Sequence, residues 1–245
     1  MFEDILNETR ENIATTRAVI LTNNKLRIIA FAQENESVKQ LKNNEQIREL
    51  LEGVPSRIKW EEYEHCGVVT RLYSIYESFV ENLIAEWLKL LPQLIPRYSD
   101  LEEKIRNTHR EGVGRLLLEL KKKQFKNLSL ETVVKGLFEG ITANENYELI
   151  PEAFLFREQN LRRNILEVLL ANAGILSDRW KFTSWDWIAR HRDVKEFIRE
   201  VKSNQNSAEK ELEQLIYYRN EAAHKFDPSK FEYKNMGYKD RKSVV

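Results

Sequence analysis

Hydrophobic positions recur every three or four residues along most of the chain, which is the spacing of α-helices. The clearest pattern covers residues 61–91, where the apolar stripe is broad and predicts a largely buried helix. This stripe comprises Val69, Leu72, Tyr76, Phe79, Leu83, Trp87 and Leu90, with Val68, Ile75 and Val80 beside it. Pro92 and Pro96 follow and are predicted to end the helix.

Further helices are expected on both sides of this segment. Residues 2–22 are predicted to form a helix that Asn23 and Asn24 break, and Gly53 with Pro55 indicates a stop. Downstream, helices are predicted at about 99–123, 129–141, 152–173, 187–201 and 207–226.

Local signals mark the ends of these helices. Ser99 and Glu102 have the spacing of a capping box, Ser129 is a typical N-cap, and Gly174 is a typical stop. Only 8 Gly and 5 Pro occur among the 245 residues, although the two residue types make up roughly 12% of an average protein. The fold class is therefore predicted to be all-α, and a turn-rich β-sandwich or barrel is excluded.

Composition and charge narrow the choice of partners. The 39 basic and 39 acidic residues give a net charge of +0, so long-range attraction to nucleic acid is weak. An RNA partner would need a local basic surface, for which the lysine cluster after residue 120 is a candidate, although a solvated helix end is the commoner explanation. This cluster consists of Lys121, Lys122, Lys123 and Lys126.

Cysteine usage and hydropathy predict a cytoplasmic protein. Cys66 is the single cysteine, which excludes an intramolecular disulfide and a multi-cysteine zinc module. No apolar run reaches the roughly 18 residues that a membrane helix needs, and the acidic, amphipathic start of the chain lacks the features of a signal peptide. We therefore expect no membrane association.

The last predicted helix contains a polar residue where its packing seam should be apolar. The seam is formed by Ala208, Leu212, Leu215, position 219, Ala222 and Phe226. Position 219 is Arg219, whose guanidinium stays charged and must be paired or face a wet cleft. Asn220 and His224 are four residues apart and share one flank of this helix.

Each of these residues also has a purely structural explanation. An arginine in a seam is often an ion-pair partner, and a histidine near a helix end is often a cap. The combination RNEAAH, with Ala222 and Ala223 allowing close approach of another backbone, favours a functional site at Arg219, Asn220 and His224.

The segment YYRNEAAH (217–224) resembles the signature of HEPN domains, which lies in the final helix of an α-helical bundle. TRLYSIYESFVENLIAEWL (70–88) resembles the second helix of that superfamily, and NLRRNILEVLLANAGI (160–175) is similar to the MAE type of HEPN-like nuclease. With this resemblance, residues 61–228 are predicted to form a HEPN-type helical bundle and residues 1–60 an N-terminal helical extension. The polar, lysine-rich composition of residues 229–245 predicts a flexible tail.

The resemblance implies a metal-independent endoribonuclease that needs no cofactor and is active as a homodimer. Arg219 would hold the scissile phosphate, His224 would act as general base on the 2′-hydroxyl or as acid for the leaving oxygen, and Asn220 would help to orient them. The products would be a 2′,3′-cyclic phosphate and a 5′-hydroxyl. Such proteins often serve as toxins or antiphage effectors, so an antitoxin or a defence-system protein is an expected partner.

Two positions qualify this interpretation. HEPN toxins that are silenced by nucleotide transfer carry a tyrosine two residues after the histidine, where this chain has Phe226. Glu77 interrupts the apolar helix at 61–91 and is expected either to pair with Arg219 or to form a surface salt bridge with a base such as Arg71. A metal pair of Glu77 with Glu81 is disfavoured because no supporting aspartate cluster accompanies it.

The remaining candidates are assigned structural roles. His65 and Cys66 are adjacent and lack a third catalytic partner by spacing, while His109 and His191 lie among charged residues and are expected to be solvated. The alternative to an enzyme is a non-catalytic helical module, in which the same seam serves only dimerisation or partner binding.

Overall fold

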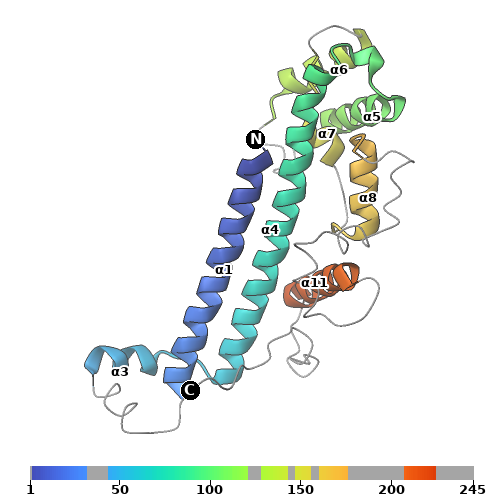
Figure 1. Ribbon diagram of the computed structural model, residues 1–245. Helices are drawn as coiled ribbons and strands as arrows, with labels where there is room; N and C mark the ends of the chain where they lie inside the picture. The colour runs from blue at the N-terminus through green and yellow to red at the C-terminus, as the bar shows by residue number, and fades with distance from the viewer. Residues whose placement is uncertain are drawn as a thin grey trace. The chain divides into compact units, whose positions relative to one another are not determined.

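The computed structural model describes residues 2–31, 44–120, 128–142, 147–155, 160–175 and 207–224 (Figure 1). Within these ranges the chain forms eight α-helices and one short 3-10 helix and contains no β-strand, which confirms the all-α prediction. The elements are α1 (Phe2–Phe31), α3 (Glu45–Glu52), α4 (Arg57–Leu94), η1 (Tyr98–Asp100), α5 (Glu103–Glu119), α6 (Leu130–Thr142), α7 (Pro151–Leu155), α8 (Arg163–Asn172) and α11 (Ser207–His224).

Several predictions from the sequence concern residues outside this description. They are the lysines Lys121, Lys122, Lys123 and Lys126, the helix at 187–201, His191, Phe226 and the tail at 229–245. No helix in the described ranges has an apolar stretch long enough to cross a bilayer.

The chain divides into two compact units, and α1, α4 and α11 each contribute to both. One unit comprises Met1–Glu11 and Ser74–Ile216, and the other comprises Asn12–Tyr73 and Tyr217–Val245. The domain boundaries expected at residues 60 and 228 stay a prediction.

The first unit has a hydrophobic core between the second half of α4 and the helices that follow it. Its fully buried members include Ile84, Leu88, Val113, Leu116, Val133 and Leu161. The Trp87 indole N–H donates to the carbonyl of Ala173 at 2.8 Å and so ties α4 to the end of α8. A Cβ atom on Gly112 would collide with the backbone carbonyl of Ala153, so the close approach of α5 to α7 requires glycine there.

Tertiary packing moves the buried stripe of α4 by about one position from the predicted one. Val69, Ile75 and Val80 are buried as expected, whereas Leu72 and Leu83 are only half-buried. The other buried residues of α4 are Tyr73, Ile84, Leu88 and Leu91. The helix also continues through Pro92 and ends at Leu94. The second proline, Pro96, ends it, because proline disfavours the helical conformation of the residue before it.

Other predicted helix ends are wrong for identifiable reasons. Helix α1 continues past Asn23 and Asn24, because the Arg27 guanidinium donates to the Asn24 side chain and also reaches α4. The Ser99 hydroxyl donates to Asp100 at 3.1 Å instead of capping α5, whose first helical residue is Glu103.

Two further predictions concern the chain after residue 128. The predicted cap is confirmed at Ser129, whose hydroxyl accepts the N–H of Thr132 at 3.0 Å. Two helices, α7 and α8, replace the single helix expected at 152–173: Arg162 is extended and Leu161 before it is fully buried. The predicted stop at Gly174 is also confirmed, with a φ of 72° that favours glycine.

His109 is completely buried, so the expectation that it is solvated is wrong. Its Nε2 accepts the backbone N–H of Ile150 at 3.3 Å, which assigns the ring proton to Nδ1. Nδ1 lies 3.2 Å from the Tyr98 hydroxyl, which donates to the Arg106 carbonyl at 3.2 Å. The ring also stacks on Phe154, with centroids 5.9 Å apart. Burial lowers the pKa of His109 to about 4.

Acid should therefore destabilise the first unit through His109. The unfolded ring binds a proton near pH 6.5 but the folded ring only near pH 4, so the free energy of unfolding should fall as the pH drops through this window. The contribution is on the order of 3 kcal/mol. In His109→Gln, whose side-chain oxygen still accepts an N–H, urea unfolding between pH 7 and 4 should show a smaller fall. Parallel pH curves for the two proteins would contradict this.

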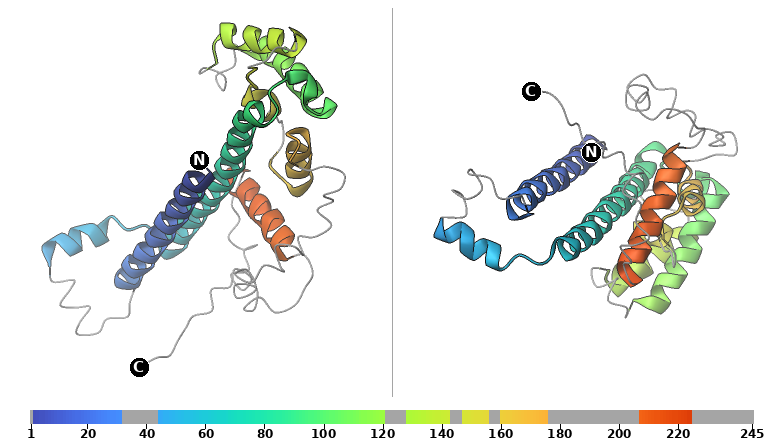
Figure 2. Two further views of the ribbon diagram at one scale, coloured as in Figure 1. Left: turned by 45° about the horizontal axis from the view of Figure 1, so that its top comes forward. Right: turned by 90° about the horizontal axis from the view of Figure 1, so that it is seen from below.

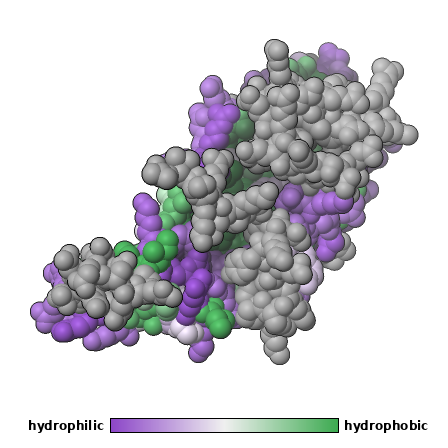
Figure 3. Space-filling model, turned by 60° about the horizontal axis from the view of Figure 1, so that its bottom comes forward, coloured by the Kyte–Doolittle hydropathy of each residue, from purple (hydrophilic) through white to green (hydrophobic). Residues whose placement is uncertain are grey.

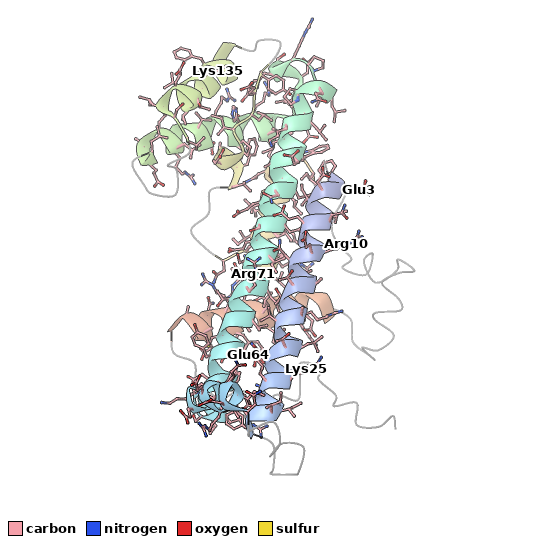
Figure 4. The ribbon with its side chains drawn as sticks, turned by 90° about the vertical axis from the view of Figure 1, so that its left-hand side faces the viewer. Glu3, Arg10, Lys25, Glu64, Arg71 and Lys135 are labelled. Carbon is pink, nitrogen blue, oxygen red and sulfur yellow. The ribbon has the colours of Figure 1, made fainter. Side chains whose placement is uncertain are left out.

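In the second unit, the C-terminal part of α1 and the N-terminal part of α4 run antiparallel and side by side (Figures 1 and 2). The Arg27 guanidinium lies 3.1 Å from Glu64 and 3.7 Å from Glu61, and the Arg71 guanidinium donates to Asn12 at 2.6 Å. Glu64 and Arg71 both project from α4 (Figure 4). The Phe31 and Trp60 rings add an edge-on contact between the same two helices, with centroids 6.2 Å apart.

Candidate active site on the last helix

The helix predicted at about 207–226 is present as α11, described over Ser207–His224, and residues 225 and 226 lie outside the described residues. Leu212 is buried as the seam predicts, but Ile216 is the fully buried residue of the next turn and Leu215 is only half-buried. The buried face is therefore rotated slightly. Arg219, three residues after Ile216, lies at the edge of this face and is half-buried.

The Arg219 guanidinium is seated on an aromatic ring. Its central carbon lies 5.4 Å from the centroid of the Tyr73 ring, and Tyr73 is only 2% exposed. A guanidinium over an aromatic face is stabilised by the negative potential of the ring, more strongly where water is partly excluded. The Tyr73 ring thus offsets part of the cost of removing Arg219 from water.

Asn220 fixes the guanidinium from a second side. Nη1 of Arg219 donates to the side-chain oxygen of Asn220 at 3.2 Å. A guanidinium carries five N–H donors in a planar fork, and this bond uses one of them. The structure therefore brings two of the three predicted motif residues into direct contact.

His224 is the last residue of α11. The backbone places position 224 four residues after Asn220, on the same face of the helix. The description covers the backbone of His224 and not its side chain, so its approach to Arg219 stays a prediction.

Glu77 lies on α4, one turn after Tyr73, and is half-buried. It belongs to the other compact unit, and its predicted pairing with Arg219 stays a prediction. The described residues include no group of three or more His, Cys, Asp or Glu side chains placed to hold a metal ion.

The neighbours of the motif include the adjacent pair His65 and Cys66. The His65 ring packs edge-on against Tyr218, with centroids 6.0 Å apart, and burial lowers its pKa. Burial, with the nearby Glu62 carboxylate, raises the pKa of the Cys66 thiol. A thiol that stays protonated is a poor nucleophile, which argues against a Cys–His catalytic pair.

Comparison with known families bears directly on the motif. The sequence model of the RiboL-PSP-HEPN family matches residues 30–242, which include α4 and all of α11. The chain belongs to the RiboL-PSP-HEPN family. The predicted HEPN superfamily is thereby confirmed, and the finer likeness to the MAE type stays a prediction.

Membership also gives a general class of function. HEPN domains are generally ribonuclease domains, and they typically bind RNA and often form dimers. No curated protein and no solved structure is significantly similar to the chain. The family match therefore supports a ribonuclease-type HEPN domain.

The seating of Arg219 on Tyr73 can be measured as a coupling energy. In a double-mutant cycle with Tyr73→Leu and Arg219→Met, the double variant should lose less unfolding free energy than the sum of the two single losses. The difference should be about 0.5–2 kcal/mol. Urea unfolding of the four proteins gives this value. Tyr73→Phe, which keeps the aromatic face, should retain most of the coupling. Additive losses would show that the ring does not hold the guanidinium.

Proposed function

We propose that this HEPN protein is a metal-independent endoribonuclease that acts as a homodimer. The observation that supports this most is the Arg219 guanidinium, which is seated on Tyr73, bonded to Asn220 and followed by His224 at the end of the same helix. A purely structural seam would be more stable with leucine at position 219, because burying an arginine costs free energy that the ring only partly offsets.

In the proposed reaction, the N–H donors of Arg219 that remain beside the Asn220 bond bind the non-bridging oxygens of the scissile phosphate. Arginine suits this role because its planar guanidinium binds two oxygens at once and stabilises the negative charge that develops on them. The 2′-oxygen of the RNA attacks the phosphorus as its proton leaves, and the 5′-oxygen departs with a proton.

His224 is the group proposed to move a proton in this reaction. It serves as general base on the 2′-hydroxyl or as general acid for the 5′-oxygen, which is the usual work of histidine near neutral pH. The products are a 2′,3′-cyclic phosphate and a 5′-hydroxyl. The reaction uses only groups of the protein and the RNA.

Three further assignments complete the proposal. Glu77 supports Arg219 from α4, and the lysines Lys121, Lys122, Lys123 and Lys126 guide the RNA backbone. Biologically, the protein is a cytoplasmic toxin or antiphage effector that an antitoxin or a defence-system protein holds in check. Phe226 stands where the nucleotide-modified tyrosine of related toxins lies, so inhibition by that modification is not expected.

RNA cleavage in EDTA tests the proposal. The wild-type protein should cleave a structured RNA, and Arg219→Ala and His224→Ala should each be slower by about 10²- to 10⁴-fold. Fragment ends identify the chemistry, since a 2′,3′-cyclic phosphate requires attack by the 2′-oxygen.

Arg48→Ala is the matched control, because Arg48 is an exposed arginine on α3 whose ion-pair partner Glu45 is exposed too. It should cleave as the wild type does. If wild type, Arg219→Ala and His224→Ala leave a range of RNAs equally intact, the ribonuclease proposal fails. A protein that still dimerises would then be a helical interaction module.

A comparison of two glutamates on α4 tests whether the proposed role belongs to Glu77 or to any negative charge on this helix. Glu77 and Glu81 are both half-buried and lie one turn apart. Glu77→Gln should slow cleavage at least tenfold, because it removes the charge that supports Arg219, whereas Glu81→Gln should have little effect. Equal rates for Glu77→Gln and wild type would remove Glu77 from the site.

A further inference from the structure

Tyr217, two residues before Arg219, exposes a large aromatic ring next to the proposed site. Its exposed fraction is 51%, whereas Tyr73, Tyr98 and Tyr147 are buried. Other hydrophobic residues are exposed among hydrophilic ones on the face seen in Figure 3, so exposure alone assigns no function.

The exposed ring is held in place by two others. Tyr217 packs edge-on against Tyr218, with centroids 5.5 Å apart and planes at 66°. Tyr218 in turn packs edge-on against His65 of α4, at 6.0 Å and 84°. This aromatic row restrains Tyr217 before any ligand binds, which lowers the entropy lost on binding.

The register of α11 places this ring on the face of Asn220, the residue that accepts a hydrogen bond from Arg219. Residues three, four and seven apart share one face of a helix, so Tyr217 lies on the face of Asn220 and of position 224. Asn220 also accepts the N–H of Arg219. Around the helix axis Asn220 lies between Arg219 and Tyr217, which themselves point to different sides of α11.

We propose that Tyr217 is a stacking subsite for an unpaired nucleobase next to the phosphate bound by Arg219. This inference rests on the proposed ribonuclease function and names its substrate class. The faces of bases in a continuous duplex are covered by their neighbours, whereas bases in loops and single strands can stack on tyrosine. The preferred substrates are therefore RNAs that are single-stranded at the cleaved position.

The test measures RNA binding apart from cleavage. Fluorescence anisotropy of the full-length protein with a labelled 2′-O-methyl oligonucleotide gives an affinity without cleavage, because the reacting hydroxyl is blocked. Tyr217→Ala should weaken binding roughly 5- to 150-fold, the range found for base–aromatic stacking. Tyr217→Phe should bind within about twofold of the wild type, since it keeps the stacking face.

Two controls make the result specific. Tyr63→Ala removes another exposed tyrosine, 83% exposed on α4, and should leave the affinity unchanged. An abasic oligonucleotide of equal length keeps the phosphates but lacks the bases. On it, Tyr217→Ala and wild type should bind alike, while Arg219→Ala should still bind more weakly than either.

The outcomes separate this inference from the proposed function. The stacking subsite is refuted if Tyr217→Ala binds the oligonucleotide as tightly as the wild type does. It is also refuted if Tyr217→Ala loses as much affinity for the abasic strand as for the strand with bases. In that case a weaker RNA affinity of Arg219→Ala would still support the ribonuclease site. If the wild type binds none of the oligonucleotides, both proposals fail. A Tyr217→Ala protein that sediments as a smaller species with unchanged RNA affinity would make the ring an interface residue and also refute the subsite.

Discussion

The proposed site depends on one interaction, the contact between the Arg219 guanidinium and the buried ring of Tyr73. Arginine cannot lose its charge when it is moved away from water, so a half-buried arginine needs compensating contacts. The Tyr73 face and the Asn220 oxygen supply two of them. The same contacts limit the motion of the guanidinium and orient its fork before any ligand arrives.

Helix α4 makes this arrangement possible because it is a single helix of 38 residues. Its second half is packed in the core of the first unit, where Ile84 and Leu88 are fully buried. Its first half carries Tyr73, which contacts Arg219, and His65, which contacts Tyr218. Tyr73 and His65 lie on the same helix, so the register of α4 sets the spacing of the two rings that meet Arg219 and Tyr218.

The sequence was informative where the signal lies within one turn. Ser129 caps α6 through a hydroxyl three residues from its N–H partner, and Gly174 adopts the positive φ that its type allows. The polar break at Arg219 was visible because helix geometry defines which positions should be apolar. Membership of the HEPN superfamily also followed from the short motif and its helical setting.

The features that the sequence does not predict depend on contacts between segments that are far apart along the chain. His109 is flanked by charged residues that point to other sides of α5, and its burial depends on Ile150 and Phe154, far along the chain. Tyr73 is one of several apolar residues on α4, and only packing selects it as the partner of Arg219. The row from His65 through Tyr218 to Tyr217 likewise joins two helices that no spacing rule relates.

The central claim is tested most directly by the single-turnover rate of RNA cleavage in Tyr73→Phe and Tyr73→Leu, with the unfolding midpoint of each protein recorded alongside. If the ring positions the guanidinium, Tyr73→Phe should cleave within a few-fold of the wild type. Tyr73→Leu should be at least about tenfold slower while still folded, as expected for a misplaced charge-stabilising group. Equal rates in both variants, whether both normal or both lost, would contradict the account.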